Sequence, residues 1–284
     1  MFEVRQTETA PKTALLDLSQ SKVRRAVTTL SQATKLLTAA CVVGLVSASA
    51  AAADLEPRTR QAYDAYVEQA RRDFLIRTRG DQAPALPRDE VAGAPARDDG
   101  IINVPGGLIH HWIGRAFLRG TALEDVIDVS KAYASYSRIY TSIIESQLLT
   151  QQGDTYRVLM RLKEGGAGIT AVFELRSTVE HVGPSAGRAH ALSDADEIRE
   201  VQNAGRRDER LLPPGRDSGY LWRASTFTRF IALRDGVYVE METLGLSRQF
   251  PPVLAWIIEP IARRLGRKSV ETSLREFLAA VRMR

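Results

Sequence analysis

Residues 269–282 read SVETSLREFLAAVR, and their pattern gives the strongest indication of the architecture. Its apolar residues recur at i, i+4, i+7, i+8 and i+11, which places them in one stripe along a helix. They are Val270, Leu274, Phe277, Leu278 and Val281. The helix is expected over Arg267–Arg282, after segments that alternate like β-strands and end at Gly245–Pro252. A striped helix that follows an antiparallel sheet buries its apolar side across that sheet, so the two are expected to enclose a space.

Seven segments before this helix have the composition of β-strands bounded by turn residues. They span residues 108–118, 143–150, 155–163, 169–182, 188–201, 220–233 and 237–247. Thr121 with Glu124 three residues later has the pattern of a capping box, which predicts that a helix begins there. A second short helical piece is expected at Tyr136–Tyr140.

The last two strands are expected to form a hairpin, because Asp235-Gly236 is a strong two-residue turn signal. With this turn, Arg229 is expected opposite Glu242. The apolar face of the hairpin is expected to face the terminal helix; it includes Trp222, Phe230, Val239 and Met241. The other face is expected to be solvated, with ion pairs worth about 0–1 kcal/mol; it includes Arg223, Arg229, Glu240 and Glu242. The opposite assignment would bury these charges, which would then have to pair or bind the polar head of a ligand.

Four stretches carry a resemblance to a known family. They are GGLIHHWIGRAFLRGTALEDVIDV (106–129), GDTYRVLMRL (153–162), WRASTFTRF with DGVYVEMETLGLSR (within 222–248) and SVETSLREFLAAVR (269–282). In order and pattern the chain resembles the START/Bet v 1-like superfamily, also called SRPBCC or polyketide-cyclase-like, over Gly107–Arg282. The resemblance implies an α+β helix-grip fold, in which a seven-stranded antiparallel sheet curls around a long C-terminal helix and leaves an internal cavity. Members bind lipids, sterols, polyketides and other apolar molecules, and some are cyclases or hydrolases.

Residues 1–53 have the layout of a secretory signal peptide. A basic flank with Arg24 and Arg25 precedes an uncharged apolar run over residues 36–53, which ends in Ala-x-Ala patterns. We expect cleavage near Ala50–Ala53 and a periplasmic or secreted bacterial protein without a stable membrane span. A twin-arginine signal and lipoprotein acylation at Cys41 are the alternatives.

Two further segments precede the main domain, which is expected over residues 107–284. Residues 54–80 predict an amphipathic helix with Tyr63, Val67 and Phe74 on one face. This helix is expected to dock on the main domain, and contact with a protein partner is the alternative. Residues 81–100 are rich in Ala, Pro, Asp and Gly, and a flexible connector is expected over residues 81–106.

Composition excludes several classes of function. Cys41 is the only cysteine and lies in the signal segment, so the remaining chain cannot form disulfides, Cys-based metal sites or a Cys nucleophile. Six of the 39 basic and three of the 34 acidic residues lie in residues 1–53, which leaves a net charge of +2 and no basic stripe for nucleic acid. His110 and His111 are neighbours in a strand and point to opposite faces, so they are not expected to share a metal. No catalytic motif is present, and no metal or other cofactor is expected.

The enclosed space predicts a non-catalytic binder or carrier of an apolar or amphipathic, lipid-like small molecule. The residues expected to line the cavity are Trp112, Trp222, Phe230, Val239, Met241, Leu274 and Phe277. Possible polar anchors are His111, Arg223, Arg229 and Glu242. Two alternatives stay open. One is a scaffold with a filled core, whose N-terminal helix and loop Arg206–Arg216 contact a partner; the other is a cyclase- or dehydratase-type enzyme with a cavity acid or base such as His111.

Overall fold

The computed structural model describes residues 53–284, with gaps at 81–82, 84–85, 87–90, 167–168 and 250–251. The signal peptide predicted over residues 1–53 lies outside the described residues apart from Ala53, and so do most of residues 81–90 of the predicted connector. From Ala52 onward the chain groups as one compact unit.

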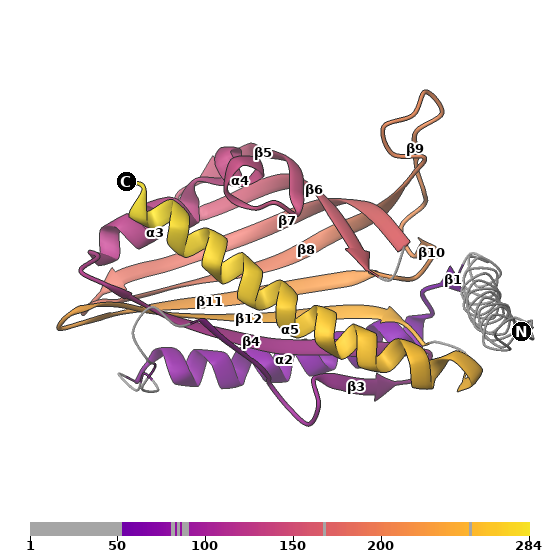
Figure 1. The fold of residues 1–284 in the computed structure, drawn as a ribbon, viewed down its shortest axis with the longest axis horizontal. Coiled ribbons are helices and arrows are strands. Elements are labelled where there is room, and N and C mark those ends of the chain that lie inside the picture. Colours follow the sequence, from indigo (N-terminus) through magenta and orange to yellow (C-terminus); the bar gives the residue numbers. More distant parts are fainter. Residues whose placement is uncertain (1–52, 81–82, 84–85, 87–90, 167–168, 250–251) are drawn as a thin grey trace, which may run out of the picture. The chain divides into compact units, whose positions relative to one another are not determined.

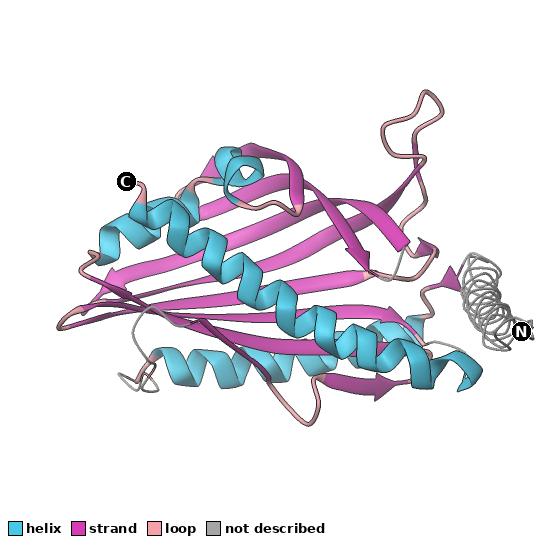
Figure 2. Ribbon diagram, viewed as in Figure 1, coloured by secondary structure: helices cyan, strands magenta, loops and turns pink. Residues whose placement is uncertain are grey.

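Seven long antiparallel strands form the main sheet, as expected (Figure 1, Figure 2). In spatial order they are β4 (Gly107–Arg119), β12 (Gly236–Arg248), β11 (Arg223–Leu233), β8 (Arg188–Gln202), β7 (Ile169–Ser185), β6 (Thr155–Gly166) and β5 (Ile143–Gln152). Short strands extend this sheet: β2 (Val91–Pro95) and β3 (Ile101–Val104) pair with β4, and β9 (Arg210–Leu211) pairs with β8. A separate pair joins β1 (Ala53–Asp54) to β10 (Arg216–Asp217).

The second half of the predicted connector is part of the sheet, so the prediction of a flexible linker is wrong there. β2 covers one half of β4, where Pro95 lies opposite Trp112, and β3 covers the other half, where Ile101 lies opposite His110. β4 would otherwise be an edge strand of 13 residues with a row of unpaired backbone groups. Pairing with that edge orders both short strands, although the chain before Ile101 is rich in Ala, Pro, Asp and Gly.

Four α-helices accompany the sheet among the described residues. They are α2 (Pro57–Thr78), α3 (Leu123–Lys131), α4 (Tyr136–Ile139) and α5 (Pro252–Arg282), and a 3-10 turn, η1 (Tyr133–Ser135), precedes α4. α2 lies along one face of the sheet and α5 crosses the other face (Figure 1). No helix in the described part of the chain is both long and apolar enough to span a membrane.

Two helix starts differ from the prediction. α5 begins at Pro252, well before Arg267; Pro260 within this stretch is a helix breaker by propensity and hides the helical signal. α3 begins at Leu123, within two residues of Thr121, so the predicted helix is present, but the capping box itself is wrong, because no side chain caps α3. β4 runs on to Arg119, and the hydroxyl of Thr121 donates back to the Arg119 carbonyl at 3.4 Å.

The register of the last hairpin is shifted by two residues from the prediction. Arg229 lies opposite Glu240 rather than Glu242. Gly236 is the first paired residue of β12 and lies opposite Leu233, so the two turn residues are Arg234 and Asp235. Glycine is required at position 236, because a Cβ there would lie 1.9 Å from the Leu118 carbonyl oxygen of β4. A shift of one residue would exchange the faces, whereas a shift of two keeps each side chain on its predicted face.

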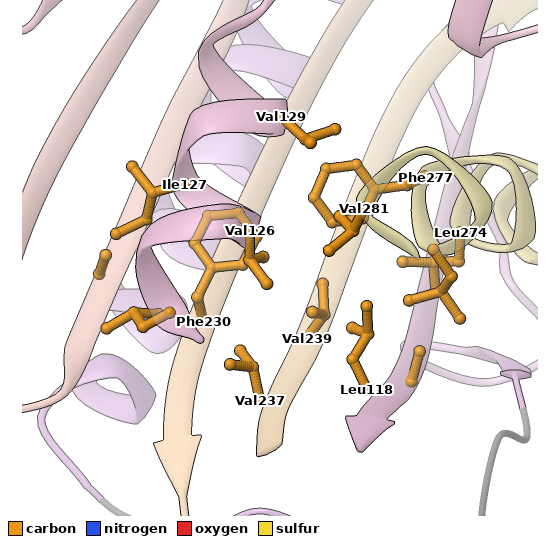
Figure 3. Packing of buried hydrophobic residues seen from close by; sticks show 14 of the residues in the cluster. Leu118, Val126, Ile127, Val129, Phe230, Val237, Val239, Leu274, Phe277 and Val281 are labelled. Carbon is orange, nitrogen blue, oxygen red and sulfur yellow. The ribbon is translucent and has the colours of Figure 1, made fainter. Parts of the chain in front are cut away.

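Each face of the sheet therefore has its own core, and we name the faces after the helices that cover them. On the α5 face, the Phe230 ring stacks on Phe277 of α5 at 6.3 Å between ring centroids, and Val239 and Leu274 pack beside them (Figure 3). On the α2 face, α2 buries one side of its length against the strands. The residues of this second core include Tyr63, Val67, Ala70, Phe74, Ile109, Leu192, Phe227, Leu244 and Leu246.

Candidate ligand-binding site

The middle of the α5 face is not closed. Ser193 on β8, Thr226 and Thr228 on β11, and Thr243 on β12 are only half-buried there. Most of the residues that alternate with them face α2 and are buried; these include Leu192, Phe227, Arg229, Glu242 and Leu244. Because side chains alternate between the two faces, accessible side chains in the centre of a sheet indicate open space above them.

Three of these residues form one row across the sheet. Ser193 lies opposite Thr226, Thr226 opposite Thr243, and Thr243 opposite Trp112. Neighbouring strands are about 4.8 Å apart, so the hydroxyls repeat at about that spacing. No hydrogen bond between described residues uses these hydroxyls. We call Ser193, Thr226 and Thr243 the hydroxyl row.

Trp112 ends the hydroxyl row at β4. Its indole lies between two glycines, because a Cβ at Gly100 or Gly266 would come within 2.5 Å or 2.3 Å of indole atoms. Only 5% of Trp112 is exposed, and its Nε1–H has no hydrogen-bond partner in the described part of the chain. A buried donor without a partner costs about 1–3 kcal/mol. Gly266 of α5 covers this N–H, so the indole forms a wall of the open region and does not offer its donor to a bound molecule.

The side chains of β8 around the hydroxyl row are small and rise little above the sheet. The inward positions of β8 carry Ala189, Ala191, Ser193 and Ala195. Across the β7–β8 pair, Ser177 lies opposite Ala195. This run of small residues leaves room on the α5 face between two apolar clusters.

A histidine bonded to a tyrosine lies one row away from the hydroxyl row. His181 is opposite Ala191, which is opposite Thr228. The Tyr133 hydroxyl lies 2.6 Å from His181 Nε2, and the Tyr156 ring packs beside them. Burial, helped by the charge of Lys131, lowers the pKa of His181 to about 4. Burial likewise raises the pKa of Tyr133, so at neutral pH both groups are uncharged.

The structure places most of the predicted cavity residues on the α5 face, in two different settings. Trp112 and Met241 lie next to the open region, where Met241 is half-buried opposite Thr228. The other four belong to the packed core that closes one end of this face: Phe230, Val239, Leu274 and Phe277. That these residues contact a ligand stays a prediction.

The placement of Trp222 on the α5 face is wrong. Trp222 belongs to the core under α2, and its Nε1–H donates to Asp217 at 3.0 Å. β11 begins only at Arg223, so strand alternation does not extend back to Trp222. Burial raises the pKa of Asp217 to about 6, while the Gly219 amide and the indole partly offset this effect.

The charged face of the hairpin is buried rather than solvated, which corrects the expectation that its ion pairs are exposed. Glu240 is 1% exposed and pairs with Arg229 at 3.1 Å, Arg115 at 3.0 Å and Arg77 of α2 at 3.3 Å. The Tyr238 hydroxyl also donates to it at 3.0 Å. Burial by itself would raise the pKa of Glu240, but the three arginines outweigh burial and lower it.

A second chain of contacts joins α2 to the sheet. The Tyr66 hydroxyl lies 2.9 Å from His111 Nδ1, and His111 Nε2 lies 2.7 Å from Glu242. Arg77 pairs with the same Glu242. A cavity of about 60 Å³ beside these residues, also lined by Arg97, is large enough for about two water molecules.

The four predicted polar anchors therefore lie on the α2 face, away from the hydroxyl row. His111, Arg229 and Glu242 connect to α2 through the contacts above, and Arg223 pairs with Asp64 of α2 at 3.8 Å. The apolar side of α2 and these polar contacts all face the sheet of the same chain. The expected docking of α2 on the main domain is therefore confirmed. The alternative of a protein partner on this side of the helix is not supported.

No metal centre appears among the described residues, which contain no group of three or more His, Cys, Asp or Glu side chains able to hold an ion. His110 and His111 face opposite ways, as alternation requires. His110 Nε2 lies 2.8 Å from the Ser247 hydroxyl, whereas His111 lies under α2.

Sequence reasoning missed the hydroxyl row. The signal was present as Thr226 and Thr228 at alternate positions of one strand, with Thr243 on its hairpin partner. Nothing in the sequence shows that Ser193 completes the row, because β8 and β11 are separated by the loop that contains β9 and β10.

The chain was compared with known proteins. No family model and no curated protein matches it. A STAR-related lipid transfer protein of Xanthomonas axonopodis is 14% identical, with 60% of this chain and 98% of that chain covered and a TM-score of 0.36. The Zhui aromatase/cyclase of Streptomyces sp. R1128 is 14% identical over 61% and 91% of the two chains, with a TM-score of 0.39. A START superfamily protein of Mycobacterium smegmatis is 9% identical over 62% and 97%, also with a TM-score of 0.39.

The chain is similar to START-type structures. At these identities and TM-scores the similarity says nothing about the ligand of this chain, and the names of the similar proteins include both a lipid transfer protein and an aromatase/cyclase. We assign the helix-grip α+β fold from the strand order and from α5 packed across the sheet.

Proposed function

We propose that this protein binds an apolar or amphipathic small molecule on the α5 face of its sheet, over the hydroxyl row. The observation that carries the proposal is the half-buried centre of this face, at Ser193, Thr226, Thr228 and Thr243. Buried apolar clusters flank that centre, one around Phe230 and Phe277 and the other formed by Phe173, Leu175, Ala195 and Ile198. Covering the apolar surface of a ligand there would contribute about 25 cal/mol per Å².

The proposed role is binding rather than catalysis. General acid–base catalysis works best with a group whose pKa lies near the working pH. The hydroxyls and the indole at this site titrate far from neutrality. His181 is held neutral by burial and is already bonded to Tyr133.

A space-filling variant tests the proposal. Thr228→Phe places an aromatic ring in the region that we propose to be open, whereas Thr150→Phe adds the same ring at an exposed position of β5. We expect native mass spectrometry of protein purified from its host to show a retained small molecule in the wild type and in Thr150→Phe. Thr228→Phe is expected to lose this adduct and to unfold at the wild-type temperature, because the ring fills space that is already available.

Two results would contradict the proposal. One is a wild-type protein that carries no adduct and binds no fluorescent apolar probe. The other is a loss of about 1–3 kcal/mol of unfolding free energy in Thr228→Phe, since overpacking of a closed core costs that much.

We further propose that the protein acts after export, with residues 1–53 removed as a signal peptide. The support is the basic flank and the uncharged run that ends at Ala50–Ala53. The intact mass of the protein from a periplasmic or culture fraction is expected to correspond to a start near residue 54. Full-length protein found only in the cytoplasm would refute export.

A further inference from the structure

We infer that the ligand is neutral where it meets the sheet and carries several oxygen atoms, which the hydroxyl row recognises. This inference rests on the proposed function and deepens it, because it names the chemistry of the ligand. Hydroxyl, carbonyl and ether oxygens fit this description. A fatty-acid carboxylate and a phosphate head group do not.

The distribution of charge over the two faces supports a neutral ligand. The charged residues in the middle of β4, β12, β11 and β8 belong to the α2 face, where Arg115, Glu240 and Arg229 pair among themselves and Asp194 pairs with Arg71 of α2. The α5 face of the same strands is uncharged around the hydroxyl row. Its residues there are Trp112, Gly114, Ala191, Ser193, Ala195, Ala224, Thr226, Thr228, Met241 and Thr243.

Among the described residues of the α5 face around the hydroxyl row, no side chain of opposite charge is available to a charged head group. Arg263 of α5 already pairs with Asp99 at 2.7 Å. A carboxylate moved out of water without a partner is strongly disfavoured. A neutral oxygen loses much less on the same transfer and can accept or donate a hydrogen bond in return.

The geometry of the row supports more than one oxygen on the ligand. Each hydroxyl of Ser193, Thr226 and Thr243 can both donate and accept. These groups recur about one strand spacing apart, at about 4.8 Å, and stand in a line across three strands. A hydrocarbon chain would leave all of them without a partner, and a single terminal head group would engage one.

The inference is tested with four probes and two variants of the chain from residue 54. The probes are diphenylhexatriene, a pure hydrocarbon; Nile red, which is neutral and carries a carbonyl oxygen; and cis-parinaric acid with its methyl ester, which differ in charge. Thr226→Val/Thr243→Val removes two hydroxyls with little change in shape. Trp112→Phe removes the indole N–H but keeps an aromatic ring, and Thr150→Val is the exposed control.

We expect the wild type to bind the methyl ester at least about tenfold more tightly than the acid at pH 8, because only the acid carries a charge into the site. The double valine variant is expected to weaken Nile red binding by about five- to tenfold, as each hydrogen bond is worth a few-fold in affinity. Trp112→Phe is expected to leave it unchanged, because α5 covers the indole N–H. Diphenylhexatriene binding stays unchanged or becomes tighter in both variants, and Thr150→Val changes none of the four constants.

The outcomes separate the two proposals. If the wild type binds none of the four probes, the proposed function fails, and the inference fails with it. If the wild type binds the probes but the acid binds as tightly as its ester, the protein is a binder and the inference is wrong. The inference is also wrong if the double valine variant weakens diphenylhexatriene binding as much as Nile red binding while circular dichroism shows it folded.

Discussion

At the scale of single residues, the alternation of side chains along each strand gives the sheet one largely uncharged face and one face with buried charges. Met241 and Glu240 are neighbours in β12, yet Met241 is half-buried on the α5 face and Glu240 is buried on the α2 face among three arginines. A buried carboxylate with several cationic partners contributes little net stability, but removal of any partner is costly. Removal of Arg77 alone would therefore weaken the attachment of α2 and leave Glu240 with one cationic partner fewer.

His181 predicts a pH dependence of stability. Its pKa is near 6.5 in the unfolded chain and about 4 in the folded protein. Between these values only the unfolded state binds the proton, so stability is complete above pH 6.5 and is lost as the pH falls toward 4. The contribution of one such group changes by at most about 1.4 kcal/mol per pH unit.

The measurement is the free energy of unfolding by urea between pH 7.5 and pH 4.5 for the wild type and His181→Gln. We expect the unfolding free energy of the variant to fall less steeply as the pH is lowered. The difference in slope is expected to correspond to at most one bound proton. His110, whose pKa burial also lowers to about 4, stays in both proteins, so the difference isolates His181. Parallel curves would show that His181 does not titrate in this way.

At the scale of elements, a glycine decides how closely α5 approaches the sheet. A Cβ at Gly114 of β4 would lie 2.6 Å from Leu274 Cδ1 and 2.8 Å from Val270 Cγ2. Leu274 is fully buried, and the stripe read from the sequence meets the sheet at this point. Gly245 of β12 points to the same side, but a Cβ there would meet nothing closer than Leu221 Cδ1 at 3.5 Å.

The pair Gly114→Ala and Gly245→Ala tests this close approach. We expect Gly114→Ala to lose about 1–3 kcal/mol of unfolding free energy, since α5 or its side chains must shift. Gly245→Ala is expected to be neutral or to gain about 0.4–1 kcal/mol from the lower entropy of its unfolded chain. Equal effects of the two substitutions in thermal and urea unfolding would mean that α5 does not lie as close to β4 as described.

At the scale of the whole molecule, residues 107–284 depend on the preceding segments to cover one face of their sheet and the edge of β4. α2, β2 and β3 precede Gly107, yet α2 covers one face of the sheet and the two short strands cover the edge of β4. A chain of residues 107–284 would expose the apolar residues under α2 and leave that edge unpaired. Exposed apolar faces and free edges promote aggregation.

We therefore expect residues 107–284 to aggregate or to unfold without cooperativity, whereas residues 53–284 form a soluble, cooperatively unfolding protein. Size-exclusion chromatography and thermal unfolding of the two chains compare them directly. A soluble 107–284 chain with the unfolding temperature of the longer one would show that α2 is only an accessory.

The seven long strands, their order along the chain, α2 and the stripe of α5 could be predicted from the sequence, because each depends on the spacing of residues within one segment. The two-residue shift of the hairpin, the pairing of β2 and β3 with β4, and the burial of the charged face follow from contacts between segments that are distant in the sequence. Arg77 and Glu242, which join α2 to the sheet, are 165 residues apart, so no local pattern records their contact. The hydroxyl row depends in the same way on strands that become neighbours only when the sheet forms.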